Sequence, residues 1–176
     1  LNTEGKKRGA MNIRRTTGPS YMGEILKLSA QNGWRHYFYG STQETLGKLK
    51  AQLEKLYPGV QIVGIYSPPF RQMTNTEDVQ IIKTINEASP DFLWVGLGAP
   101  KQEKWMAEHQ GKVKGLMVGV GAAFDYYAGN IKRAPAWMQK SNLEWLYRLI
   151  QDPKRLYKRY FVTNSKFIWN AMVRGK

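Results

Sequence analysis

The 176-residue sequence contains no cysteine, which excludes disulfide bonds, thiolate metal sites and a cysteine nucleophile. It has no apolar run near the ~20 residues of a membrane-spanning helix, and we expect no signal peptide. It also lacks the Walker A and G-x-G-x-x-G patterns of common nucleotide-binding loops. Its two histidines, His36 and His109, have no ligand spacing around them. We therefore expect both to be structural or exposed, and no metal centre.

Acidic residues are scarce, with 13 Asp and Glu against 27 Lys and Arg and a net charge of +14. Such an excess indicates an anionic partner: nucleic acid, a phosphorylated substrate or an acidic membrane surface. Residues 132–176 contribute eleven basic residues and only two acidic ones. Hydrophobic residues at 42% are otherwise typical of a globular domain. Because the sequence begins with Leu1 and not Met, we expect a fragment or a trimmed form.

Four apolar segments predict strands, at residues 36–39, 60–66, 92–97 and 115–121. The last two are nearly continuous apolar runs, as in strands covered on both faces. Helical patterns alternate with the strands, which predicts an α/β fold: Rossmann-like, doubly wound, with a mainly parallel sheet.

Two of those helical patterns are well defined. Residues 42–57 carry leucines on one stripe and open at Ser41 or Thr42. Residues 76–88 open at Thr76, and Val79, Ile82 and Ile85 form the apolar face.

The pattern changes after residue 129, where strand-and-helix alternation stops. An irregular link containing Pro135 precedes two or three short helices, rich in aromatic residues and arginine. We expect an α/β core over residues 1–134 and a helical, basic appendage over residues 135–176.

The stretch "WVGLGAPKQEKW", residues 94–105, predicts a strand-to-helix corner at the carboxyl edge of the sheet, where such folds bind ligands. Gly96 and Gly98 allow a sharp turn, and Pro100 suits a first helical turn. Lys101 adds positive charge, and the amide of Gln102 can donate and accept. An ordinary turn with a solvated Lys-Gln-Glu face remains the alternative.

A second corner follows in "VGVGAAFDYYAGN", residues 118–130. Gly119 and Gly121 flank the strand end, and Asp125 lies in the first helical turn. Asp125 would orient a sugar hydroxyl or act as a base, or would simply interact with a helix N-terminus.

Three tail arginines, Arg148, Arg155 and Arg159, are spaced by seven and four residues and share a face of a continuous helix. Guanidinium groups match phosphate oxygens, although a solvated basic face is the alternative.

The blocks "YPGVQIVGIYSPPF", "PDFLWVGLGAPKQEKWM", "VGVGAAFDYYAGNIKRAPAWMQ" and "LEWLYRLIQDPKRLYKRY", in this order, resemble the WecG/TagA/CpsF glycosyltransferases (glycosyltransferase family 26). The resemblance runs from about residue 12 to about residue 167. It implies transfer of an N-acetylmannosamine-type or related sugar from a UDP-sugar to a polyprenyl-diphosphate-linked sugar, with inversion and without a metal or other cofactor. It places the protein on the cytoplasmic face of a bacterial membrane, in surface polysaccharide or teichoic acid synthesis. Whether the protein forms a homo-oligomer is left open.

The resemblance also assigns residues. "NIRRTTGPSYM" matches the family's Arg-x-x-Gly-Pro-Asp-Leu block, which makes Arg15 a candidate catalytic residue and Gly18 a substrate-binding one. Ser20 and Tyr21 stand where the family has Asp and Leu. "GAPKQE" matches outright, so Gln102 is expected to be a catalytic residue that contacts substrate, pointing into the donor site. Gly98, Lys101 and Asp125 complete the expected donor side, and the tail arginines are expected to meet the acceptor's diphosphate.

The sequence departs from the family at its start. The family's Asp-Gly motif supplies the proposed catalytic base, but here "LNTEGKKRGAMN" contains no aspartate. "LNT" resembles what precedes that motif, which makes Asn2 and Thr3 candidate substrate-binding residues. A loop that is deleted or lies outside this sequence explains the missing aspartate better than substitution of the base by Glu4 does. The family's further N-terminal elements are also expected to be lacking.

Two other interpretations remain at this point. The charge suggests a nucleic-acid-binding α/β module, although the basic residues lie away from the expected donor site, so no nucleic acid is expected. A catalytically silent relative would still bind UDP-sugar. From about residue 141, we expect the appendage to rest on an anionic membrane surface; a purely structural helical cap is the alternative.

Overall fold

The computed structural model describes residues 16–135, 137–138, 141, 143–151 and 153. The chain forms two compact units, divided between Asn130 and Ile131, close to the predicted boundary after residue 134. The first unit contains, in order, α2 (Gly18–Asn32), β1 (Arg35–Gly40), α3 (Gln43–Leu56), β2 (Gln61–Tyr66), α4 (Asn75–Glu87), β3 (Phe92–Gly96), α5 (Lys101–Glu108), β4 (Leu116–Gly119) and α6 (Ala123–Tyr127).

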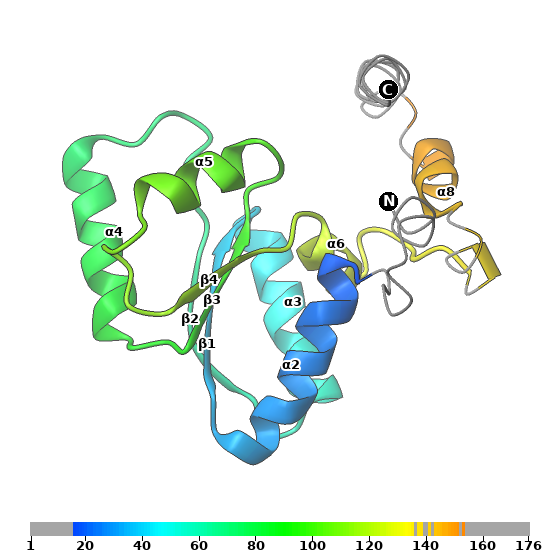
Figure 1. Cartoon of the computed structure of the whole chain (residues 1–176), viewed down its shortest axis with the longest axis horizontal. Coiled ribbons are helices and arrows are strands. Elements are labelled where there is room, and N and C mark those ends of the chain that lie inside the picture. The colour runs from blue at the N-terminus through cyan, green and yellow to red at the C-terminus, as the bar shows by residue number, and fades with distance from the viewer. Residues whose placement is uncertain (1–15, 136, 139–140, 142, 152, 154–176) are drawn as a thin grey trace, which may run out of the picture. The chain divides into compact units, whose positions relative to one another are not determined.

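The sheet has four strands in the order β2-β1-β3-β4, and every neighbouring pair is parallel. Helices α2, α3 and α6 cover one face, and α4 and α5 cover the other (Figure 1). The chain winds outward from β1 to β2 and then crosses back to β3, so the topological switch point lies between β1 and β3. The predicted Rossmann-like, doubly wound α/β fold is confirmed.

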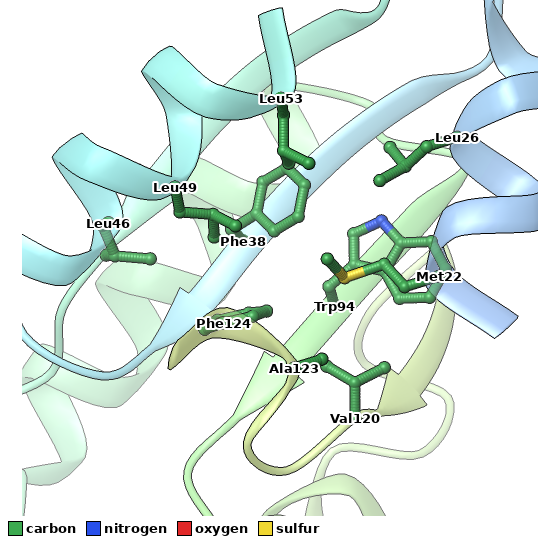
Figure 2. Close-up of a cluster of buried hydrophobic side chains, with 10 residues drawn as sticks. All are labelled: Met22, Leu26, Phe38, Leu46, Leu49, Leu53, Trp94, Val120, Ala123 and Phe124. Carbon is green, nitrogen blue, oxygen red and sulfur yellow. The ribbon is translucent and has the colours of Figure 1, made fainter. Parts of the chain in front are cut away.

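The larger apolar core lies under α2, α3 and α6. The predicted stripe of α3 comprised four leucines: Leu46, Leu49 and Leu53 are fully buried beside Phe38 of β1 (Figure 2), but Leu56, at the end of the helix, is 50% exposed. On the same face Trp94 of β3 packs in the same cluster. Each buried leucine contributes about 2 kcal/mol of transfer free energy, so this face holds the unit together.

The second core, under α4 and α5, corrects two expectations. Ile81, Ile82 and Ile85 are the buried residues of α4, whereas Val79 is 68% exposed. The helix is capped at Thr74 and not at Thr76, because the Thr74 hydroxyl accepts from the backbone of Glu77 while the Glu77 side chain accepts from the backbone of Thr74. This reciprocal capping box provides acceptors for two backbone N–H groups, those of Thr74 and Glu77, and so fixes the start of the helix.

Helix α2 is an element that the periodicity analysis did not assign. Pro19 lies in its first turn, and Gly33 ends it in the left-handed region with φ 68°, its N–H bonded to Ser29. Met22 and Leu26 are fully buried in the larger core. The helix therefore brings the end of the Arg-x-x-Gly-Pro block onto the sheet.

The second unit contains α8 (Glu144–Gln151), a helix within the predicted appendage. The Gln151 side chain bonds both the N–H and the carbonyl of Lys132, at 3.2 and 3.0 Å. Trp137 and Ile150 are 62% and 69% exposed. In the described part of the chain, no helix combines the length and the apolarity that a membrane span requires.

Candidate functional site

The corners that follow β1 and β3 face each other across the switch point, where doubly wound sheets bind ligands. The two backbones approach closely there, because a Cβ on Gly40 would lie 2.6 Å from the carbonyl carbon of Gly96. A Cβ on Gly96 would in turn lie 2.5 Å from ring atoms of Phe124 in α6. Glycine at both positions lets the edge of the sheet close tightly beneath the corners.

The β3–α5 corner has the predicted strand–glycine–helix form. Gly98 has φ 76°, the Ala99–Pro100 peptide is cis, and Pro100 is the N-cap of α5. Lys101 is exposed, whereas Gln102 is only 7% exposed. The alternative of a plain solvated Lys-Gln-Glu face is therefore wrong for its central residue.

The Gln102 amide joins this corner to the next one. Its Oε1 accepts from the Gly121 N–H at 3.1 Å, and its Nε2 donates to Glu103 Oε1 at 2.9 Å. A glutamine amide has a second N–H and a second lone pair, so both bonds are compatible with a substrate contact. That contact remains a prediction.

The β4–α6 corner carries Asp125 in the first turn of α6. Its carboxylate accepts from Asn130 Nδ2 at 3.3 Å, and the same amide donates to Thr45 Oγ1 at 3.0 Å. Thr45 lies in the first turn of α3, so Asn130 holds the Asp125 carboxylate near the start of that helix. The half-buried Asp125 is thus brought to the same edge of the sheet as Gln102.

The β1–α3 corner is part of this edge, and sequence reasoning used it only as a helix start. Ser41 has φ 57°, in a region that non-glycine residues seldom adopt. Its carbonyl accepts from the Ser67 hydroxyl at 2.7 Å, and the Thr42 hydroxyl caps α3 by accepting from Thr45 N. The signal was present in "YGST", a glycine and capping residues directly after an apolar strand.

Gly18 starts α2 against the end of β4, where a Cβ would lie 2.6 Å from the Val120 carbonyl oxygen. The structure therefore brings Gly18, Gly98, Gln102 and Asp125 to one edge. The other predicted site residues lie outside the described residues, namely Asn2, Thr3, Glu4, Arg15, Arg155 and Arg159. Arg148 belongs to α8, but its side chain is not among those described.

Both histidines are buried, His36 fully and His109 with 3% exposure, so the structural interpretation holds for each. His109 Nε2 lies 2.8 Å from Asp78 Oδ2, and its ring stacks on Trp105 at 4.2 Å, which links α4 to α5. Trp105 stacks in turn on Tyr39, and burial raises the pKa of the Tyr39 hydroxyl, which keeps it protonated. Within the described residues, no three His, Cys, Asp or Glu side chains gather as a metal set.

Positive charge is distributed unevenly along the chain. Residues 16–130 hold eleven basic and ten acidic residues. Residues 1–15 hold five basic and one acidic, and residues 131–176 hold eleven and two. Residues 16–130, which form the sheet and its helices, are thus nearly neutral, and the excess belongs to residues 1–15 and 131–176.

A parallel, doubly wound sheet with glycine corners at its switch point is the architecture in which α/β proteins bind ligands at the carboxyl edge of the sheet. The model of the glycosyl transferase WecG/TagA/CpsF family matches residues 5–176. The chain therefore belongs to this family.

Curated relatives agree with the family match. An N-acetylglucosaminyldiphosphoundecaprenol N-acetyl-beta-D-mannosaminyltransferase of Bacillus subtilis (strain 168) is 34% identical over 142 residues, 80% of this chain and 54% of the relative. A protein of the same name from Staphylococcus aureus (strain MW2) is 33% identical over 143 residues, 81% of this chain and 54% of the relative. The chain thus spans about half the length of these relatives.

Proposed function

We propose that the chain takes part in transfer of an N-acetylmannosamine-type sugar from a UDP-sugar to a polyprenyl-diphosphate-linked N-acetylglucosamine, in teichoic acid or related surface polysaccharide synthesis. The observation that carries the proposal is the family membership, with relatives at 33–34% identity whose names describe that acceptor and sugar. The tied corners at the switch point support it, since they gather polar groups at the edge where this fold binds ligands.

The donor's diphosphate is assigned to the starts of α3 and α5, because the N-terminal end of a helix favours anions. Lys101, exposed in the first turn of α5, adds a positive charge beside them. In this proposal these groups stabilise the UDP leaving group without a metal. They would act most strongly as the bond between the anomeric carbon and the UDP oxygen breaks.

Inversion follows from attack by the acceptor hydroxyl on the face of the anomeric carbon opposite UDP. The new carbon–oxygen bond forms as the old one breaks, and the hydroxyl proton passes to a base. Asp125 is the carboxylate that we assign to this edge, either as that base or as a partner of a sugar hydroxyl. Its hydrogen bond from Asn130 supports a fixed orientation for either role.

The appendage is proposed to hold the protein peripherally on the inner, anionic face of the membrane. The concentration of positive charge in residues 131–176 supports this, as does the exposure of Trp137 and Trp145. Each Lys or Arg close to an anionic leaflet adds about 1 kcal/mol. The tail arginines would then meet the acceptor's diphosphate.

The test is a turnover assay of the full chain with UDP-N-acetylmannosamine and a short-chain lipid-diphosphate-linked N-acetylglucosamine, alongside calorimetric titration with UDP. Formation of a lipid-linked disaccharide and UDP supports the proposal. UDP binding without turnover identifies the silent relative instead. Binding of a single-stranded oligonucleotide without binding of UDP would refute both and favour a nucleic-acid-binding module.

A further inference from the structure

The site of the Gln102 side chain is built by two corners that are separate in sequence. Its Oε1 accepts from Gly121 N at 3.1 Å, and the residue is only 7% exposed. Gly119, the last residue of β4, leaves the space for the amide, because a Cβ there would lie 3.0 Å from Nε2 and 3.2 Å from Cδ. The end of β4 and the β4–α6 corner therefore both contact this one amide.

Gly121 is the position where the corner needs a fixed partner. The Val120 N–H still donates to Val95 of β3, at 3.0 Å, but the next residue leaves the sheet with φ 56°. Helix α6 starts two residues later, and its N-cap, Ala122, makes no side-chain cap hydrogen bond. The Gln102 oxygen thus accepts from the first N–H beyond the sheet, at the residue that precedes the N-cap of α6.

We propose that Gln102 is a positioning residue: it holds the β4–α6 corner, from Gly121 to Asp125, against the β3–α5 corner, so that the two form one wall. That this wall faces substrate rests on the proposed function; the positioning itself rests on the geometry. A direct substrate contact, which the family resemblance implies, makes a different prediction. Contact alone leaves the substrate-free corner unchanged when Gln102 is replaced, whereas positioning changes it.

The first measurement is amide hydrogen exchange by NMR on the substrate-free full chain. Gln102→Met keeps the length of the side chain but removes the acceptor, so Gly121 exchange should rise about tenfold, as for loss of one hydrogen bond. Exchange at Phe38 and Val95, inside the sheet, should stay unchanged. Glu103→Gln is the matched control, because its side-chain oxygen still accepts from Gln102 Nε2 and Gly121 should stay protected.

The second measurement is UDP affinity, which should fall together with Gly121 protection. The dissociation constant for UDP should rise about tenfold in Gln102→Met and stay unchanged in the control Glu103→Gln. If Gly121 exchange is unchanged in Gln102→Met, the proposal is overturned. If that variant also loses UDP binding while Gly121 exchange is unchanged, the result favours direct contact. A uniform rise in exchange across the sheet overturns it in favour of general stability.

Gly119→Ala provides a second variant in which Gln102 itself is intact. The added Cβ crowds the amide, so Gly121 exchange should rise as it does in Gln102→Met, and this variant carries the test if the other does not fold. Protection of Gly121 in Gly119→Ala would contradict the proposal. Should the unmodified chain fail to bind UDP, the proposed function fails, while the exchange data still decide the positioning role.

Discussion

The buried imidazole of His36 should make the stability of the α/β unit fall as the pH is lowered from 7 to 5. His36 is fully buried on β1, and its Nδ1 accepts from Trp94 Nε1 at 3.0 Å. Nε2 has no hydrogen-bond partner among the described residues. Protonation would place a charge in the core and set two N–H donors against each other. Burial accordingly lowers the pKa of His36 from 6.5 to about 4, although Asp91 opposes the shift.

The size of the effect follows from proton linkage. Above pH 6.5 the ring is neutral in both states, so the full stability is present. Between pH 6.5 and 4 the unfolded chain takes up the proton first, and stability is lost as the pH falls through this window. At pH 5 the loss relative to pH 8 is about 2 kcal/mol from this group.

Urea unfolding followed by tryptophan fluorescence at pH 8 and pH 5 measures the loss. His36→Gln lacks the titrating ring, so the difference between the two pH values should be about 2 kcal/mol smaller in the variant, with other titrations cancelling. Equal pH dependence in both proteins would refute the reasoning. NMR of the wild-type ring gives an independent check, since a midpoint between pH 6 and 7 would contradict a pKa of about 4.

Other predictions follow from single contacts. Thr74→Ala should cost about 1 kcal/mol in urea unfolding through loss of the capping box, and Thr74→Ser should restore most of it. Gly64→Ala should cost about 1–3 kcal/mol because its Cβ would overlap the Tyr37 ring, whereas Gly47→Ala, in open space on α3, should gain about 0.5–1 kcal/mol; equal effects would contradict the packing. Changing the three tail arginines to glutamine should weaken binding to anionic vesicles in a sedimentation assay, and unchanged binding would remove them from the membrane contact.

The fold was predictable because its signals are local. Apolar runs identified all the strands of the described sheet, to within two residues at each end. The leucine stripe of α3 was visible from spacing alone. Helix α2 was not assigned because Gly18, Pro19 and Gly23 interrupt its apolar pattern, and those glycines are required by packing against Val120 and Tyr127, which spacing does not reveal.

The site was predictable only in part, since its defining contacts join distant residues. The sequence predicted that Gln102 and Asp125 lie on strand-to-helix corners, and the structure confirms these two positions. The burial of Gln102 depends on the absence of a side chain at Gly119, on the next strand of the sheet. The hold on Asp125 passes through Asn130 to Thr45, 85 residues earlier in the chain. Neither relation has a periodicity or motif that marks it.

The distribution of charge assigns different tasks to the α/β unit and its flanking segments. Residues 16–130, with eleven basic and ten acidic residues, have little long-range attraction for a polyanion. In the proposed function, they bind the donor's diphosphate at short range, through helix N-termini, corner N–H groups and Lys101. The flanking segments carry nearly all of the +14 excess, and they alone supply a long-range field. A nucleic acid tracking the sheet would need basic residues along it. In the proposed function, UDP needs only these short-range groups at the edge, whereas the lipid-linked acceptor on an anionic surface needs the long-range field of the charge in residues 1–15 and 131–176.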